Sequence, residues 1–331
     1  MNQIGIDISN DVFDCTMPYG DRVVRRQFSN TPADYRQFAK WGLRQATAAQ
    51  VCMESTGVYH LQLALYLDEH PDFQVMLVNP CAARRFIQAH MVRAKTDAID
   101  ADGVLLYLQK MPWRPWSAPK ELVLQLQSIA HRMSQLEKEI TRERCRLHAA
   151  RQAGPHTGAA QQDIQAHIKQ LQRRLQSMKT RASQVIGRDE QLAEDVRIID
   201  TAPGFAELSA TKLLAELSPL PHDMRPEQWV AHAGMDPRPS ESGTSMHPPR
   251  HISKQGNARI RAALFMPALV AVQHDPHVKA YYQKMLASGK PKMLALNAVM
   301  RRQLHALWGM LHHRQDWDGE KFYQLNRPNT A

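Results

Sequence analysis

The chain has 331 residues, of which 43% are hydrophobic and 22% charged, and these values exclude wholesale disorder. No apolar run approaches the roughly 20 residues that span a bilayer. The first residues lack the basic and apolar regions of a secretory signal, so we expect neither a membrane segment nor a leader. The four cysteines, at positions 15, 52, 81 and 145, form no C-x-x-C pair. This spacing argues against a zinc cage or a disulfide framework and fits a reducing cytoplasm.

The positive charge is unevenly distributed along the chain. The net charge is +10, to which residues 1–100 contribute −1 and residues 101–331 contribute +11. Between residues 251 and 314, ten basic side chains accompany a single acidic one, Asp275. A near-neutral first part and a basic second part suggest a chemical module joined to a module that binds a polyanion such as nucleic acid. A basic face that only keeps the protein in solution is the alternative.

The first 100 residues alternate between strand-like and helix-like segments. The expected strands cover residues 3–9, 11–18, 21–29, 49–55 and 73–80. Tyr19 and Gly20 form a hairpin turn between the second and third of these strands. The expected helices cover residues 31–46, with Thr31 as cap and Pro32 in the first position, residues 57–69, and a segment from Pro80 past Asp100. This order implies a mixed sheet flanked by helices.

The rest of the chain is predicted to be mainly helical. Apolar residues recur at three- and four-residue steps over 120–151 and again over 162–186, which predicts an antiparallel hairpin or a dimerising coiled coil. The turn at Pro203 and Gly204 resembles half of a phosphate-binding helix-hairpin-helix, although Ala206 replaces its usual second glycine. Further expected elements are helices over 225–234, 258–274 and 291–313, a long polar loop over 237–257 and a loose tail after about Gln315.

Four carboxylates occur where a metal site could form. Asp7 and Glu54 each end an apolar strand, and Asp97 and Asp100 are three residues apart on one helix face. If the four converge, their mutual repulsion requires divalent cations, and carboxylate oxygens suit magnesium, with manganese as the alternative. Two such ions about 4 Å apart can clamp the attacking and leaving oxygens of a phosphodiester. Taken singly, each acid is more typical of a surface residue or a cap. Together, on this strand order, they indicate an RNase H-like metal site.

The order of several short motifs is more specific. I-G-I-D-I-S, M-E-S-T-G-V-Y, L-V-N-P and A-K-T-D-A-I-D-A are followed by P-G-F, by E-S-G-T-S and by S-K-Q-G-N-A-R-I-R-A-A-L-F-M-P-A. Over roughly residues 3–313 the chain resembles the DEDD transposases of bacterial mobile elements, the insertion sequence 110 family, which includes the Piv-type DNA invertases. The resemblance implies an α/β RNase H-like (RuvC-like) catalytic domain over 1–112, a coiled-coil or helical linker over 113–190 and a mainly α-helical C-terminal transposase domain over 191–331.

The resemblance also assigns roles to residues. Asp7, Glu54, Asp97 and Asp100 would be the four catalytic, metal-binding acids. The E-S-G-T-S segment matches the family's Ser-Gly-x-Ser element, which makes Ser242 the candidate nucleophile, with Ser240 and Ser245 as neighbouring alternatives. Without the family, serines in such a loop are more typical of turns. A serine–DNA intermediate conserves bond energy, and the chain has no G-x-x-x-x-G-K-[ST] nucleotide-binding loop.

Basic residues near these positions are candidates for contacts to nucleic acid. They are Arg84, Arg85, Arg93, Lys95, Arg238, Arg250, Lys254, Arg259 and Arg261. The resemblance implies donor and target DNA as substrates, a bridge RNA that pairs with both, a dimer or tetramer as the working form, and a place at the bacterial nucleoid in the cytoplasm. The alternatives are a Piv-like invertase without an RNA guide, a RuvC-type junction nuclease that uses the acids alone, and a binding scaffold with a degenerate site.

Overall fold

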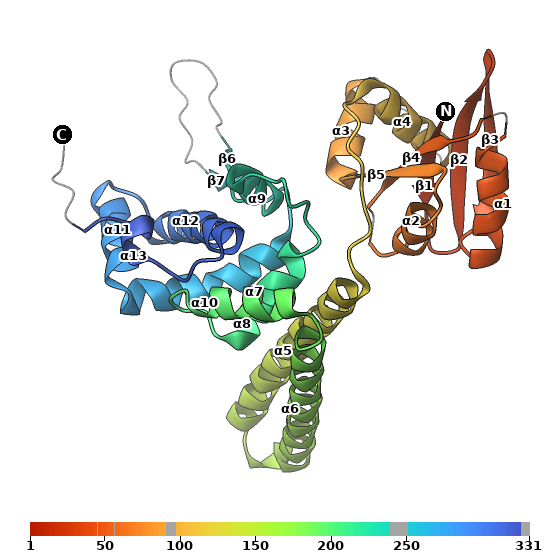
Figure 1. Cartoon of the computed structure of the whole chain (residues 1–331). Helices are drawn as coiled ribbons and strands as arrows, with labels where there is room; N and C mark the ends of the chain where they lie inside the picture. The colour runs from red at the N-terminus through yellow and green to blue at the C-terminus, as the bar shows by residue number, and fades with distance from the viewer. Residues whose placement is uncertain (45, 56, 91–96, 239–250, 326–331) are drawn as a thin grey trace, which may run out of the picture. The chain divides into compact units, whose positions relative to one another are not determined.

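The computed structural model describes residues 1–44, 46–55, 57–90, 97–238 and 251–325, with side chains for all of these except residues 97–99, Arg238 and His251. Internal contacts divide the chain into two units, Met1–Ala118 and Pro119–Ala331 (Figure 1). Within the described ranges, no helix combines the length and apolar character that crossing a membrane requires. The three-part division at residues 112 and 190 stays a prediction.

A mixed five-stranded sheet forms the centre of the first unit, as the sequence predicts. Its strands are β1 (Asn2–Ile8), β2 (Val12–Tyr19), β3 (Arg22–Ser29), β4 (Ala49–Glu54) and β5 (Phe73–Val78). They lie in the order β3-β2-β1-β4-β5. The β1–β2–β3 pairs are antiparallel, whereas β1, β4 and β5 are parallel. Gly20, with φ 59°, allows the tight turn between β2 and β3.

Helices cover both faces of this sheet (Figure 1). They are α1 (Pro32–Gly42), α2 (Leu61–Asp68), α3 (Pro80–Ala89) and α4 (Asp97–Lys110). Phe38 of α1 and Leu63 of α2 pack against Ile4 and Ile6 of β1 in one core. Val104 of α4 packs in a separate core. Helices therefore cover both faces of the sheet at β4 and β5, whereas most side chains of β3 are exposed.

Three details of the first unit differ from expectation. The helix predicted over 57–69 begins only at Leu61, after a turn in which Gly57 has φ 58°. The segment predicted from Pro80 past Asp100 is two helices, α3 and α4, and not one. Thr31 occupies the N-cap of α1, but its side chain makes no capping hydrogen bond. Pro32, which needs no amide partner, opens the helix without that help.

A long helical hairpin opens the second unit. It consists of α5 (Glu121–Ala153) and α6 (Gly158–Ile186), joined by the short 3-10 helix η1 (Pro155–Thr157). Leu136 and Ile140 of α5 pack against Leu171 of α6. Gly154, with φ 104°, ends α5. Of the two arrangements that the apolar stripe allowed, the hairpin within one chain is observed.

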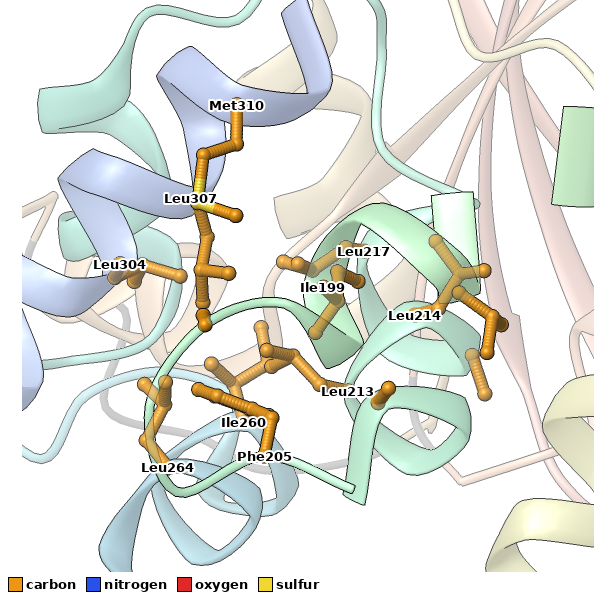
Figure 2. Close-up of a cluster of buried hydrophobic side chains, with 14 of the residues drawn as sticks. Ile199, Phe205, Leu213, Leu214, Leu217, Ile260, Leu264, Leu304, Leu307 and Met310 are labelled. Atoms are coloured by element: carbon orange, nitrogen blue, oxygen red, sulfur yellow. The ribbon is translucent and has the colours of Figure 1, made fainter. Parts of the chain in front are cut away.

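The remaining elements form a helical bundle. They are α7 (Glu190–Asp200), α8 (Glu207–Leu217), α9 (Pro226–His232), β6 (Pro237–Arg238), β7 (His251–Ile252), α10 (Ala258–His274), α11 (Pro276–Ala287), α12 (Lys292–His313) and α13 (Gly319–Phe322). Their shared core contains Leu213 of α8, Leu264 of α10 and Leu304 of α12, each fully buried (Figure 2). The turn at Gly204, with φ 86°, lies against the backbone of Pro267 in α10.

Three C-terminal expectations were wrong or incomplete. α11 was not expected, although Asp275 accepts a hydrogen bond from the Val278 amide at 2.8 Å and Pro276 opens the helix. The tail after Gln315 is not loose as far as Phe322, which belongs to α13 and is only 2% exposed because it packs on Tyr281 and Trp317. The loop over 237–257 is not wholly irregular, since β6 and β7 pair near its two ends.

Candidate active site

Asp7 and Glu54 occupy neighbouring positions at one edge of the sheet. The parallel register of β1 and β4 pairs Ile6 with Met53, so the next residue of each strand is one of these acids. Glu54 is the last residue of β4, and Asp7 is the next to last of β1. Adjacent strands lie about 4.8 Å apart. The two carboxylates therefore come from backbone positions that the sheet itself holds together.

Both acids lie on the sheet face that α4 covers. Side chains alternate between the two faces of a strand. Ile6 and Met53 point into the core with α1 and α2, whereas Cys52 packs with Val104 of α4. Burial, together with the negative charge of Glu54, raises the pKa of the Cys52 thiol to about 12. Asp7 and Glu54, which directly follow Ile6 and Met53, therefore point to the α4 side.

Gly5 brings α4 directly against β1. A Cβ atom at Gly5 would lie 2.3 Å from the Leu105 nitrogen and 2.5 Å from the Ala101 carbonyl oxygen, distances that real structures do not tolerate. Only glycine permits this approach of helix backbone to strand. Asp100 immediately precedes Ala101, and Asp7 is two residues beyond Gly5 on the same face. The glycine thus determines how near the helix acids come to the strand acids.

The segment after α4 runs antiparallel along β5. The Trp116 amide donates to the Val75 carbonyl at 2.7 Å, and the Ala118 amide donates to Asp68 at 2.9 Å. The first turn of α4 contains Asp97 and Asp100, and the next residue, Ala101, lies against Gly5 of β1. We call the strand ends that carry Asp7 and Glu54 the acidic edge. The convergence of the two helix acids on this edge stays a prediction.

Asp102 anchors the same helix to the antiparallel part of the sheet. Its Oδ1 accepts hydrogen bonds from Thr16 Oγ1 at 2.8 Å and from Arg25 Nε at 3.0 Å, and its Oδ2 accepts from Arg25 Nη2 at 2.6 Å. A helix residue two positions from Asp100 points about 200° away from it. Asp102 therefore fixes the helix on β2 and β3 while Asp100 turns the other way. Neither Gly5 nor Asp102 was among the residues predicted from the sequence to be functional, although a glycine inside a strand is a signal of close approach.

The donor set suits a hard divalent cation. Asp7, Glu54 and Asp100 are all partly buried carboxylates, and carboxylate oxygens are the ligands that magnesium and manganese prefer. Among the side chains that the structure describes, no three His, Cys, Asp or Glu groups lie close enough together to form a ready metal cage. The Asp97 side chain is outside that set. The residues fit the ion by their chemistry, and Asp7 and Glu54 also by their neighbouring positions on β1 and β4.

The predicted serine segment belongs to the second unit. Ser240, Ser242, Ser245 and Arg250 lie outside the described residues, as do Arg93 and Lys95 of the first unit. The structure describes the two ends of this segment. Pro237 of β6 pairs with Ile252 of β7, and Ser253 donates through Oγ to Asp236 Oδ1 at 2.5 Å. Residues 239–250 thus leave and re-enter the bundle at one paired point, which we call the root.

Two glycines allow close backbone contact at the root. A Cβ at Gly256 would lie 2.2 Å from the His232 carbonyl oxygen, and one at Gly234, where φ is 63°, would lie 2.8 Å from the Gln255 nitrogen. The two backbone segments therefore touch. The Lys254 amide donates to the Gly234 carbonyl at 3.0 Å and the Asn257 amide to the His232 carbonyl at 2.7 Å. This packing leaves no room for side chains between the segments.

A buried carboxylate ties the root to the hairpin. Glu216 of α8 is only 4% exposed. Its Oε2 accepts from Asn257 Nδ2 at 2.6 Å, and its Oε1 lies 2.6 Å from His131 Nε2 of α5. Asn257 also caps α10 by accepting from the Arg259 amide at 2.9 Å. Burial alone would raise the pKa of Glu216, but the hydrogen bonds from His131 and Asn257 outweigh it and the pKa is lowered. The charged carboxylate therefore links α5, α8 and α10.

The described basic candidates fall into two groups. Arg84 and Arg85 on α3, and Lys254 and Arg259 near the root, have exposed side chains. Arg261 is partly buried, and its Nη1 donates to the carbonyl oxygens of Ala233 at 2.7 Å and Gly256 at 3.3 Å. At least part of the Arg261 guanidinium therefore stabilises the root. Arg238 is described by its backbone alone, in β6. Their contacts to nucleic acid remain predictions.

Comparison with known proteins identifies the family. The DEDD transposase family of IS110 matches residues 4–152, and the transposase family IS116/IS110/IS902 matches residues 196–283. The pilin gene-inverting proteins of Moraxella bovis and Moraxella lacunata are each 23% identical over 319 residues, which cover 95% of this chain and 97% of each relative. An uncharacterized 42 kDa protein of insertion element IS900 from Mycobacterium paratuberculosis is 31% identical over 34% of this chain and 29% of its own length.

The family matches fall on both units, and the fold agrees with them. The first match spans the sheet with its acidic edge, and the second spans α8, the root and α10. The chain belongs to the IS110/IS116/IS902 family of DEDD transposases, enzymes that act on DNA, and is related to the pilin gene-inverting proteins.

Proposed function

We propose that this transposase cuts and rejoins DNA through a covalent bond to Ser242, assisted by divalent cations at Asp7, Glu54, Asp97 and Asp100. The observation that carries the proposal is the acidic edge of the first unit, where Asp7 and Glu54 end neighbouring strands on the face that α4 covers. Carboxylates that converge there would repel one another unless cations or protons neutralise them. Magnesium, or manganese in its place, would be held there.

The bound cations would polarise the scissile phosphate and favour ionisation of the attacking hydroxyl. A free serine hydroxyl is a weak nucleophile at neutral pH and needs such activation. In the step itself, the Ser242 oxygen forms a bond to phosphorus, one P–O bond of the DNA backbone breaks, and the serine proton ends on the released sugar hydroxyl. Reversal by a new sugar hydroxyl rejoins the strand. The number of phosphodiester-type bonds is conserved, so the reaction needs no nucleotide cofactor.

The test is a trapping experiment with the full chain. The protein is incubated with magnesium, element RNA and end-labelled donor and target DNA, and denatured samples are examined for a protease-sensitive protein–DNA adduct. We expect Ser242→Ala to bind DNA and to form no adduct. Ser288→Ala, which removes another hydroxyl of the second unit, is the matched control and should keep the adduct. Cleavage by Ser242→Ala would instead favour a RuvC-type nuclease that uses the acids alone.

A bridge RNA is the second part of the proposal. The uneven charge, concentrated after residue 100, supports a surface that binds nucleic acid. The related pilin gene-inverting proteins, similar over 95% of the chain, favour a second candidate, an invertase that acts on fixed sites without a guide. Specific, high-affinity binding of the element's RNA by the purified protein supports the guided recombinase. Recombination of fixed sites in RNase-treated reactions supports the invertase.

Joining two duplexes requires four strand cuts, so we propose a dimer or a tetramer as the working form. With one Ser242 per chain, a monomer would have to reposition between cuts. Sedimentation of the protein with donor and target DNA measures this directly. A complex that recombines DNA with a single protein chain would contradict it.

A further inference from the structure

A cavity of about 660 Å³ lies in the second unit beside the root. It is bounded by α11, α12 and α13, and Pro237 of β6 and Ile252 of β7 also line it. These two residues pair with each other across the short sheet. The cavity therefore adjoins the point where residues 239–250, with Ser242 among them, leave and re-enter the bundle.

The lining of this cavity is strongly basic. Lys290, Arg301, Arg302 and Lys321 contribute cations, and His305 adds a fifth basic side chain. None of the described residues that line it is acidic, and none of the four cations pairs with a described carboxylate. Burial, together with the adjacent Arg301, lowers the pKa of His305. Unpaired positive charge around a cavity attracts an anion.

The interior of the same cavity is apolar and partly aromatic. Tyr281, Met285 and Leu294 line it together with Phe322. The Arg302 guanidinium lies 4.9 Å from the centre of the Tyr281 ring and 5.4 Å from that of Phe322, and its Nε donates to the Phe322 carbonyl oxygen. Arg302 is therefore part of the wall. The exposed Arg301 and Lys321 remain at the rim.

We propose that this cavity binds one unpaired nucleotide of a nucleic-acid strand, with its base on the apolar interior and its phosphate on Arg301. The inference rests on the proposed function, because it assigns the site to a DNA or RNA strand that the proposed recombinase binds beside the root. The volume lies within the range of small-ligand sites, large enough for a mononucleotide and too small for a base pair with both backbones. Bases stack on aromatic side chains without sequence preference, and a cationic rim follows the backbone.

The test uses photocrosslinking in a Ser242→Ala background, so that no cleavage is needed. Decamers that carry a single 4-thiothymidine or 4-thiouridine are irradiated with the full-length protein, and the crosslinked peptide is identified by mass spectrometry. We expect crosslinks at 281–306 or at 321–322. Arg301→Ala should weaken decamer binding about tenfold, the size of one lost charge-assisted contact. Ala298→Phe, which narrows the cavity without changing charge, should strongly reduce these crosslinks.

Arg188→Ala is the matched control, since it removes an exposed arginine of the same unit that does not line the cavity. It should leave the crosslinks in place. Preferential crosslinking of the thymidine decamer assigns the site to DNA, and that of the uridine decamer assigns it to RNA. Crosslinks that map elsewhere, or that persist in both cavity variants, overturn the proposal. Such a result would not change whether the unmodified chain forms the Ser242 adduct. The cavity proposal can therefore be wrong while the proposed function is right.

Discussion

The two units hold the residues proposed to act in different ways. In the first, Asp7 and Glu54 are neighbours because the register of two parallel strands sets them there, and Gly5 lets α4 approach. In the second, the root of residues 239–250 is held by glycine contacts and by the buried Glu216. The register of β1 and β4 depends on backbone hydrogen bonds, so it persists when one side chain is replaced. The network around Glu216 consists of side-chain hydrogen bonds and is lost when that side chain is removed. Substitutions at the acidic edge of the first unit should therefore lower the rate of DNA cleavage. Substitutions at the root in the second unit should lower the stability of the fold.

Asp7→Asn should have the largest effect and leave the fold intact. We expect DNA cleavage to fall about 10³-fold or more, because loss of a metal ligand removes several kcal/mol of transition-state stabilisation. The melting temperature should stay equal or rise slightly, since one of several repelling carboxylates is gone. Adduct formation and calorimetry measure the two quantities. Chelation with EDTA should reproduce the loss, and Asp21→Asn, an exposed acid in the β2–β3 turn, should not.

Glu216→Ala should show the opposite pattern. It leaves His131 and Asn257 without their buried partner, which costs about 3–5 kcal/mol, or about 10 °C in melting temperature for a unit of this size. A melting temperature within 2 °C or so of the parent would contradict the proposed role of the network.

The same residue predicts a pH dependence. The folded pKa of Glu216 lies below its unfolded value. Its contribution to stability is therefore present above about pH 4.3 and is lost as the pH falls through the folded pKa. Denaturant unfolding at pH 7 and well below pH 4, at about pH 2.5, checks this. Glu216→Gln should lose less stability on acidification than the parent does, and equal losses in both proteins would show that another group is responsible.

Gly5→Ala should affect both properties. The added Cβ would meet the backbone of α4 at 2.3 Å, so the helix must shift, at a cost of about 1–3 kcal/mol. A shift of about 1 Å at a reacting group can lower a rate about 10²-fold. Cleavage rate and melting temperature are measured together. Gly20→Ala, at a position with no neighbouring atoms within 4 Å, separates the backbone strain of a turn from this steric effect.

Asp102→Asn should have the smallest effect. Its ion pair with Arg25 is partly exposed, with side-chain exposures of 33% and 52%, so solvent screening limits its contribution to about 0.2–1 kcal/mol. Cleavage should fall less than tenfold. A loss as large as that of Asp7→Asn would place Asp102 among the metal ligands and would break the distinction between anchoring and reacting carboxylates on α4.

The five strands of a mixed sheet, and the acids at the ends of two of them, could be predicted from the sequence because they depend on local signals. Each of these signals extends over only a few residues of the sequence. They are the alternation of apolar residues, the turn at Gly20 and the acids at strand ends. The long hairpin was readable for the same reason. α11 was readable too, from Asp275 and Pro276, but its mixed composition gives only a weak apolar stripe.

Other features depend on contacts between distant segments. Nothing near Phe322 indicates that Tyr281 and Trp317 bury it. The contact of Gly234 with Gly256 and the bond from Asn257 to Glu216 join residues 22 and 41 positions apart, and no periodicity reports them. From the sequence, Arg261 was predicted only as one of several basic residues that contact nucleic acid near the serine loop. Its contacts to Ala233 and Gly256 show that a basic residue can also be part of the scaffold.

The central claim is that Ser242 becomes covalently joined to DNA when the acidic edge holds its cations. The most direct measurement is tandem mass spectrometry of the adduct formed with magnesium, after nuclease digestion to a nucleotide remnant. We predict a phosphoserine-linked nucleotide on Ser242, absent when Asp7 is replaced by Asn. A remnant on Ser240, Ser245 or another residue, or complete strand cleavage without any remnant, would contradict the account.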